Sequence, residues 1–212
     1  MQRQIIILTA RREAPLLQQF LLEQNPFLSV GIAHNLSSLT AAVNRFDGNV
    51  RIISFLAGTI VPGALLSRLQ LTPYNIHPGS PEYPGSHPES FAIWDDAETF
   101  GVTAHEMTAR VDAGPIVAVC RFPAPPNSER MELADLTYAH AVNVFSLVGA
   151  YCADTDESMP PMEEEQWAPH KRTNKQFQAL CQMPAGASPD MAAKLWRACG
   201  DDLISHAAAA QA

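Results

Sequence analysis

Cysteine is scarce in this sequence, and the few cysteines are scattered. None of the four pairs as C-x-x-C within the 212 residues. Four scattered cysteines without such a pair favour free thiols, buried or at the surface, in a reducing compartment. The cysteines are Cys120, Cys152, Cys181 and Cys199.

Long apolar runs are also missing. Residues 5–8 are a short apolar stretch, and no run anywhere approaches the length of a membrane span. No charged leader precedes a long apolar core at the N-terminus. We therefore expect a cytoplasmic protein that makes no membrane contact.

Basic residues are outnumbered. The 14 Lys and Arg stand against 22 Asp and Glu, which gives a formal net charge of -8 and a pI near 5.3. Surfaces that bind nucleic acids are usually basic, so this balance argues against a nucleic-acid partner. A hydrophobic content of 47% is that of an ordinary globular chain.

Apolar runs typical of strands alternate with stretches of helical spacing in the first third of the chain. This alternation predicts an α/β fold with an open, mostly parallel sheet flanked by helices, of Rossmann type. Ser37 or Ser38 is the expected N-cap of the second helix. The expected strands are residues 4–9, 28–33, 50–56 and 74–77, and the expected helices are residues 14–24, 37–46 and 62–69.

Further along, a short helix near residues 89–95 and two strands at residues 101–108 and 116–122 are expected. Residues 128–151 carry an apolar stripe at spacings of three and four and predict the longest helix. His140 lies on this stripe, where a core or boundary histidine is expected. The stripe consists of Leu133, Leu136, His140, Val144, Leu147 and Tyr151.

The composition changes at residue 154. Residues 154–165 hold six acidic residues, no basic ones and the pair Pro160-Pro161. This composition is typical of a solvated connector. We therefore predict a first domain over residues 1–153, followed by an acidic connector and a short helical C-terminal extension over residues 154–212.

The motif Asn-Ile-His-Pro at residues 75–78 is the first candidate for chemistry. Residues two apart on a strand face the same way, so Asn75 and His77 share a face while Ile76 points to the core. Pro78 ends the strand and places the pair at its carboxyl end, where open parallel sheets bind ligands. An amide beside an imidazole can stabilise an oxyanion. The alternative is a capping or core-satisfying role.

A second candidate is Asp112, in the motif Asp-Ala-Gly-Pro at residues 112–115 between two predicted strands. An ordinary β-turn is the alternative, since Asp and Gly are the usual turn residues. A carboxylate near His77 would favour the imidazolium and could relay a proton.

These motifs together resemble the catalytic core of the folate-dependent formyltransferase family, which includes glycinamide ribonucleotide transformylase, methionyl-tRNA formyltransferase and sugar N-formyltransferases. The resemblance covers residues 50–122 well and the rest loosely. It includes the Gly-Val-Thr of residues 101–103 with the following His105. Residues 1–153 would then be the formyltransferase catalytic domain.

The resemblance implies a transferase of one-carbon metabolism with 10-formyltetrahydrofolate as formyl donor. It implies Asn75, His77 and Asp112 as catalytic residues: an oxyanion donor, a charged oxyanion donor, and a base or relay. Two loops would contact the pterin. Their residues are Leu56, Ala57, Gly58, Thr59, Ile60, Val61 and Pro62 in one loop and Thr108, Ala109 and Arg110 in the other.

The acceptor is less defined. The loop after His77 is shorter than the family pattern, and the first predicted strand ends in Thr-Ala-Arg-Arg instead of a Gly-rich phosphate loop. We therefore expect a small-molecule amine, such as an amino sugar or an amino-acid-like metabolite. Arg11 and Arg12 could hold an acidic group of it; simple solvation of both is the alternative.

Other readings stay open. Water could replace the amine, which would make the chain a formyltetrahydrofolate hydrolase, or the chain could be a catalytically silent folate-binding module. A metal site from His77, His87, His105 and Asp112 lacks supporting spacing, so no metal is expected. The tail after residue 155 could cover the site or form a homodimer contact.

Overall fold

A six-stranded sheet organises the computed structural model, which describes residues 2–46 and 48–204. The strand order is β2-β1-β3-β4-β5-β6; the pairings from β2 through β4 are parallel, and β5 and β6 are antiparallel to their neighbours. The predicted α/β fold with a mostly parallel sheet is confirmed. The strands are β1 (Gln4–Leu8), β2 (Ser29–Ala33), β3 (Arg51–Phe55), β4 (Tyr74–His77), β5 (Thr99–Glu106) and β6 (Ile116–Pro123).

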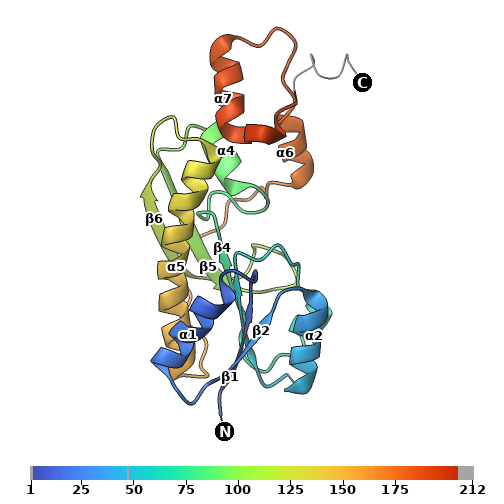
Figure 1. The fold of residues 1–212 in the computed structure, drawn as a ribbon, viewed down its shortest axis with the longest axis vertical. Coiled ribbons are helices and arrows are strands. Elements are labelled where there is room, and N and C mark those ends of the chain that lie inside the picture. Colours follow the sequence, from blue (N-terminus) through green and yellow to red (C-terminus); the bar gives the residue numbers. More distant parts are fainter. Residues whose placement is uncertain (1, 47, 205–212) are drawn as a thin grey trace.

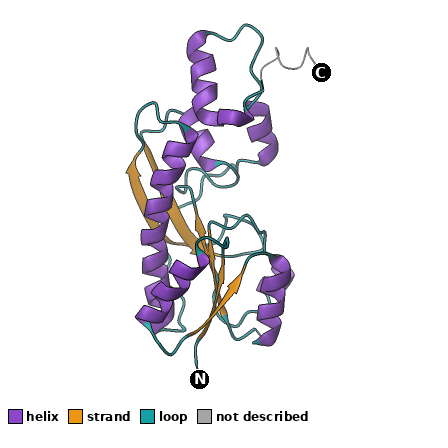
Figure 2. Cartoon of the chain, in the orientation of Figure 1, coloured by secondary structure: helices purple, strands orange, loops and turns teal. Residues whose placement is uncertain are grey.

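Helices cover both faces of the sheet. Figure 1 shows α1 and α5 on one side of it and α2 on the other, with α6 and α7 beyond α4 at one end of the molecule. Figure 2 shows the same layers by element type. The helices are α1 (Ala14–Gln24), α2 (Leu36–Arg45), α3 (Gly63–Leu66), α4 (Pro88–Trp94), α5 (Arg130–Asp154), α6 (Asn174–Leu180) and α7 (Pro189–Cys199), and a short 3-10 helix follows at Gly200–Asp202.

Alternation along β1 divides the core into two layers. Ile5 and Ile7 pack with residues of α1 and α5, whereas Ile6 and Leu8 pack with residues of α2. All four side chains are almost fully buried. A strand that is covered on both faces consists of consecutive apolar residues. The apolar run at residues 5–8 predicted a strand for this reason.

The start of α2 differs from the prediction. Asn35, and neither Ser37 nor Ser38, is the N-cap residue: its side chain accepts a hydrogen bond from the backbone N–H of Ser38 at 2.9 Å. The Ser38 hydroxyl in turn lies 3.3 Å from the backbone nitrogen of Asn35, which completes a capping box. Asparagine caps as well as serine, so sequence alone did not separate the two.

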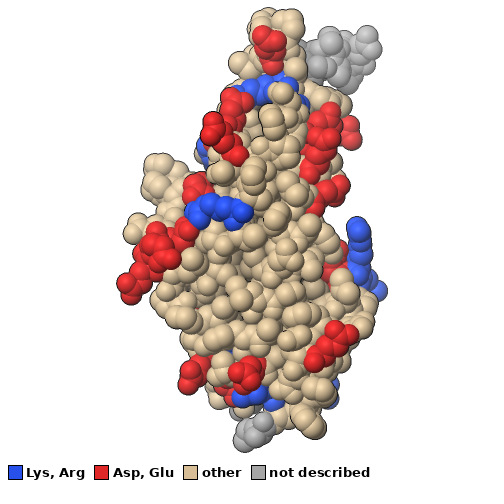
Figure 3. Space-filling view, turned by 90° about the vertical axis from the view of Figure 1, so that its left-hand side faces the viewer, with Lys and Arg blue, Asp and Glu red and all other residues tan. Residues whose placement is uncertain are grey.

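Helix α5 is long and carries no charged residue between Asp135 and Asp154. Figure 3 views the side on which β6 and α5 lie in Figure 1 and shows a broad area without charged side chains, with acidic groups towards its margins. Leu147 on α5 is 56% exposed. Among residues 2–46 and 48–204, no helix is both long and apolar enough to cross a membrane.

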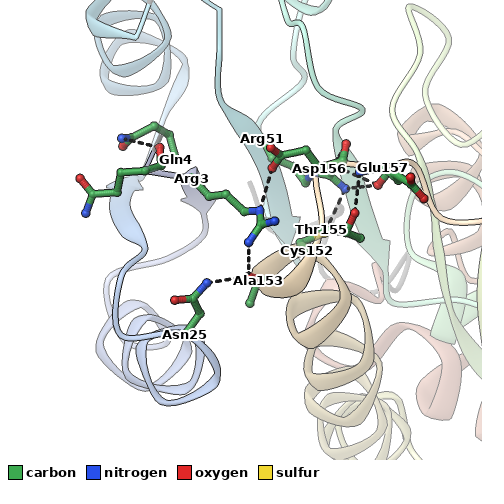
Figure 4. Close-up of polar contacts among 10 residues, drawn as sticks. Arg3, Gln4, Asn25, Arg51, Cys152, Ala153, Thr155, Asp156 and Glu157 are labelled. Atoms are coloured by element: carbon green, nitrogen blue, oxygen red, sulfur yellow. Dashed lines mark hydrogen bonds and ion pairs between the residues drawn. The ribbon is translucent and has the colours of Figure 1, made fainter.

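A buried arginine fixes the chain where α5 ends. Arg51 on β3 is 1% exposed, and its guanidinium donates to the backbone carbonyls of Asp156 at 2.6 Å and Glu157 at 3.0 Å (Figure 4). The Tyr74 hydroxyl then accepts a hydrogen bond from the backbone N–H of Met159 at 2.7 Å. The acidic side chains of this segment are largely exposed, as expected of a solvated stretch, but its backbone is bound to the sheet.

The C-terminal extension also packs on the first part of the chain. Phe177 of α6 and Ala198 of α7 share a buried cluster with Phe91 of α4. The backbone N–H of Arg172 donates to the carbonyl of Pro84 at 2.9 Å. The division at residues 153 and 154 stays a prediction; in the structure the two parts share side-chain and backbone contacts.

We predict that Arg51→Met lowers the free energy of unfolding by about 3 kcal/mol, because hydrogen bonds to a charged group contribute about 1.5–3 kcal/mol and two carbonyls lose their donor. Urea denaturation measures this change. Arg68→Met is the matched control, since Arg68 is exposed, and should change stability little. Equal effects of the two substitutions would contradict the role of Arg51.

Candidate functional site

A cavity of about 580 Å³ opens where β3 and β4 end. The stretch that follows β3, the end of β4, the loop before α4 and the loop after β5 line it, and the C-terminal extension closes it with residues 171–174. The carboxyl ends of parallel strands are where open α/β sheets bind ligands. This volume is typical of a small-molecule site.

The motif on β4 points into this cavity as predicted. Asn75, Ile76 and His77 all contribute to its lining, but Ile76 is fully buried and belongs to the apolar core. His77 is 4% exposed and Asn75 is partly exposed. The alternation along the strand therefore separates the polar pair from the apolar core residue.

Asp112 lies between the two histidines of the site. Its Oδ2 atom is 3.7 Å from Nδ1 of His77, and its Oδ1 atom is 3.4 Å from Nε2 of His105. The backbone N–H of Gly85 donates to Oδ2 at 2.9 Å. Asp112 has φ of 46°, a left-handed conformation that aspartate tolerates better than most residues. The turn thus directs a buried carboxylate towards both rings.

His105 is a residue of this cavity to which the sequence motifs assigned no role. It is the direct partner of Asn75 in the antiparallel β4–β5 pairing, so the two side chains lie on the same face. Nδ1–H of His105 donates to the Glu106 carbonyl at 2.9 Å, and Nε2 lies 3.1 Å from the Asn75 amide nitrogen. In the neutral ring, Nε2 therefore accepts from the amide and fixes its orientation.

Both ring nitrogens of His77 have partners. Nε2–H donates to the Tyr83 carbonyl at 2.9 Å, which leaves Nδ1 turned towards the Asp112 carboxylate. When the ring is protonated, both of its N–H groups face acceptors. The two acceptors can therefore hold an imidazolium, although burial keeps the pKa of the ring below its ordinary value.

Burial and charge oppose each other at this pair. Burial lowers the pKa of His77, and the Asp112 carboxylate and the Tyr83 carbonyl act against that effect. For Asp112, burial acts to raise the pKa. When the His105 ring is protonated, its Nε2–H donates to the carboxylate instead of accepting from Asn75; this hydrogen bond and the charges of both histidines outweigh burial, so the pKa of Asp112 lies below its ordinary value. Asp112 is thus the stable anion of the site.

Trp167 shields the two histidines. Its ring centroid is 5.1 Å from that of His105 and 5.8 Å from that of His77, with both imidazoles at a steep angle to the indole. Its Nε1–H donates to the Gly114 carbonyl at 2.9 Å, beside the Asp112 turn. In the sequence, Trp167 is a single aromatic residue in a polar segment. Its contact with the two histidines is visible only in the fold.

The two loops expected to hold a pterin lie at this cavity, apart from two residues. Residues 56–61, Thr108 and Arg110 line it. Pro62 instead caps α3, and Ala109 faces Gly63, where a Cβ atom would come within 2.9 Å of the Ala109 Cβ. A Cβ atom at Gly58 would meet no atom within 4 Å, so close contact with protein atoms does not explain why this residue is a glycine.

The two arginines after β1 lie elsewhere. Arg12 lines a second cavity of about 340 Å³, and Arg11 lines neither cavity. The second cavity is adjacent to the first, because Leu56, Pro78 and Glu89 line both. Within residues 2–46 and 48–204, no group of three or more His, Cys, Asp or Glu side chains could hold a metal ion.

Comparisons with known proteins identify the family and the fold. A family model described as formyl transferase matches residues 11–148. A comparison with curated protein sequences finds no significant match.

Solved structures share the fold at low identity. A sugar N-formyltransferase from Shewanella sp FDAARGOS_354 superposes with a TM-score of 0.77 at 18% identity, over 95% of this chain and 90% of that one. HypX from Aquifex aeolicus in complex with tetrahydrofolic acid gives 0.68 at 19% identity, over 97% of this chain but 36% of that one. An N-formyltransferase from Helicobacter canadensis, in complex with folinic acid and dTDP-3-aminofucose, gives 0.67 at 14% identity, over 93% and 80%.

We predict that Asp112→Asn lowers the pKa of His77 further, because the carboxylate is the main group that opposes the effect of burial on this ring. An NMR titration of the His77 ring resonances measures the shift. Asp190→Asn, at an exposed position on α7, is the control and should leave the titration unchanged. An unchanged pKa in Asp112→Asn would show that the two side chains do not interact.

Proposed function

The chain belongs to the formyl transferase family, and on that premise we propose that it transfers a formyl group from 10-formyltetrahydrofolate to the amine of a small-molecule acceptor. The observation that carries the proposal is the Asp112 carboxylate between two imidazoles, beside the Asn75 amide, on the wall of a cavity of about 580 Å³. This is a set of groups for charge stabilisation and proton transfer at a carbonyl.

Asn75 is the oxyanion donor in this proposal. When the acceptor nitrogen attacks the formyl carbon, negative charge develops on the formyl oxygen. The Asn75 amide has two N–H bonds, and the contact with His105 uses one of them. The second can donate to that oxygen from a fixed position, which is the preorganised arrangement that oxyanion stabilisation needs.

His77 contributes its positive charge. Its Nε2–H is held by the Tyr83 carbonyl, so a direct hydrogen bond to the oxygen needs this N–H to turn away from that carbonyl. Without that movement, the imidazolium still stabilises the developing charge at short range in a buried site. Asp112 orients the ring and favours its charged form against the effect of burial, which holds the pKa of His77 below its ordinary value.

Proton transfer is the second task. The attacking nitrogen must lose a proton, and the departing N10 nitrogen of the folate must gain one. Asp112, through a water molecule, accepts the first proton, and the same path returns a proton to N10. No atom or charge is left over, so the site needs no metal or redox group for this reaction.

The first cavity suits the donor. Its wall combines apolar side chains such as Leu56, Ile60 and Met107 with backbone of the stretch after β3. Flat heteroaromatic rings bind well between apolar side chains and backbone hydrogen-bonding groups. Two of the structural neighbours contain tetrahydrofolic acid or folinic acid, which supports a folate donor for this chain too.

Cellular context follows from the same proposal. A folate-dependent formyl transferase acts in one-carbon metabolism, and a cytoplasmic location fits the free thiols. A homodimer stays a prediction. The uncharged face over α5 is where we expect its contact.

We predict that Asn75→Ala, His77→Gln and Asp112→Asn each reduce formyl transfer by about a hundred- to thousandfold, because each removes a group that acts on the transition state. Mass spectrometry of the acceptor, which gains one formyl group, measures the rate. His140→Gln is the matched control for His77→Gln, since His140 stacks on Phe122 and lines neither cavity.

The same assay separates the alternatives. Formate release without any amine would indicate a hydrolase, and folate binding with no turnover across an amine library would indicate a silent binding module. A wild-type rate in any of the three substituted proteins would contradict the assignment of that residue.

A further inference from the structure

The second cavity adjoins the proposed site of formyl transfer. It lies between the loop after β1, the first turn of α4 and the Ala134–Tyr138 part of α5. Its volume of about 340 Å³ corresponds to roughly eleven water molecules in the liquid. A compact molecule of sugar or amino-acid size fits this space. Leu56, Pro78 and Glu89 line both cavities, so a molecule in the second cavity lies next to the first.

Its charge is unbalanced. Three acidic residues, Glu13, Glu89 and Asp135, line the cavity together with one basic residue, Arg12. None of the four forms an ion pair with any residue the structure describes. One carboxylate oxygen of Glu13 is shielded from solvent and has no hydrogen-bond partner among the described residues. Carboxylates in such surroundings favour a cation.

Glu89 occupies the junction between the cavities. Its side chain lines both of them, and no basic side chain lies within ion-pair distance of it in the described part of the chain. Burial raises its pKa to about 7, although its own backbone N–H and the more distant Arg130 act in the opposite direction. A partly buried carboxylate that faces two cavities without a counter-charge is less stable than one in water, and a cationic ligand would stabilise it.

We propose that the second cavity binds the acceptor of the formyl group, that this acceptor is a compact cationic amine without phosphate, and that Glu89 binds its ammonium group. This inference rests on the proposed formyl transfer and narrows its substrate class. Three carboxylates around one arginine repel a phosphate or diphosphate group. The acceptor class therefore differs from the sugar nucleotide in the Helicobacter canadensis complex.

Glu89 also prepares the amine for attack. An ammonium has no lone pair, so it must lose a proton before its nitrogen can form a bond to the formyl carbon. The Glu89 carboxylate takes that proton, which gives a neutral amine and a neutral carboxylic acid at the junction, and it releases the proton to solvent after the product leaves. The amine lone pair attacks the formyl carbon at this junction, on the side where Asn75 and His77 line the first cavity. Tyr138 offers a hydroxyl group to the rest of the acceptor.

The test compares matched acceptors with the full chain and 10-formyltetrahydrofolate. Glucosamine, glucosamine 6-phosphate and a panel of primary amines, each with and without a phosphate group, are assayed for kcat/KM by mass spectrometry. We expect every pair that is turned over to favour the unphosphorylated amine by at least about tenfold. A preference for the phosphorylated partner would overturn the inference and leave formyl transfer standing.

Glu89→Gln then tests the residue. It should lower kcat/KM for the preferred amine by about ten- to hundredfold, because a charged hydrogen bond and a proton acceptor are lost. The KM for 10-formyltetrahydrofolate should stay within about twofold, since its pterin loops do not include Glu89. Glu89→Asp should restore part of the activity. Glu98→Gln, at an exposed position outside both cavities, is the matched control and should behave as the wild type.

The outcomes separate the two proposals. Equal loss in Glu89→Gln and Glu98→Gln, or a loss confined to the KM of the donor, would overturn the role of Glu89 only. No formyl transfer to any amine of the panel would overturn both the acceptor class and the proposed function.

Discussion

A single buried negative charge, the carboxylate of Asp112, holds the site together. Groups from three separate segments surround it: His77 on β4, His105 on β5 and the backbone N–H of Gly85 before α4. An isolated buried carboxylate would be very unfavourable, so these contacts must form together or not at all. The charge therefore fixes the relative positions of the end of β4, the face of β5 and the loop between β4 and α4. Because its pKa is lowered, the carboxylate stabilises the fold above about pH 4 and loses that effect as the pH falls through its folded-state pKa.

The C-terminal extension belongs to this arrangement. Trp167 lies over both histidines and donates a hydrogen bond beside the Asp112 turn, and residues 171–174 form part of the cavity wall. The extension can take up this position because its beginning is anchored far away, where Arg51 binds the carbonyls of Asp156 and Glu157 (Figure 4). A segment that composition marks as a connector is thus a structural part of the site. The exposed acidic side chains made it look solvated, while its backbone carries the contacts.

Local patterns predicted the parts of the site that depend on local geometry. The two-residue period of a strand placed Asn75 and His77 on one face, and the proline after His77 placed them at a strand end. His105 could not be assigned in this way, because its position beside Asn75 depends on the antiparallel register between β4 and β5. The role of Arg51 could not be predicted from the sequence either. A charged residue in a strand usually indicates a strand at the edge of the sheet, and only the folded structure shows the carbonyl groups that bind its guanidinium. The stripe on α5 predicted a helix, yet Leu147 on that stripe is 56% exposed. Helix α5 packs on the core through Ala141, Val144 and Val148, of which only Val144 belongs to the stripe.

Charge distinguishes the two cavities more clearly than shape does. The first cavity is lined in part by Arg110 and Lys171, two exposed basic residues in loops. Acidic residues dominate the lining of the second cavity. A folate carries carboxylates on its glutamate tail, and an acceptor amine in water carries a positive charge. In the proposed reaction, each substrate would therefore be attracted to one cavity and repelled from the other, so the two would bind at the same time without competing. The proposal places the ammonium group beside Glu89 and the formyl carbon beside Asn75 and His77, so that the reacting atoms would meet where the two cavities adjoin.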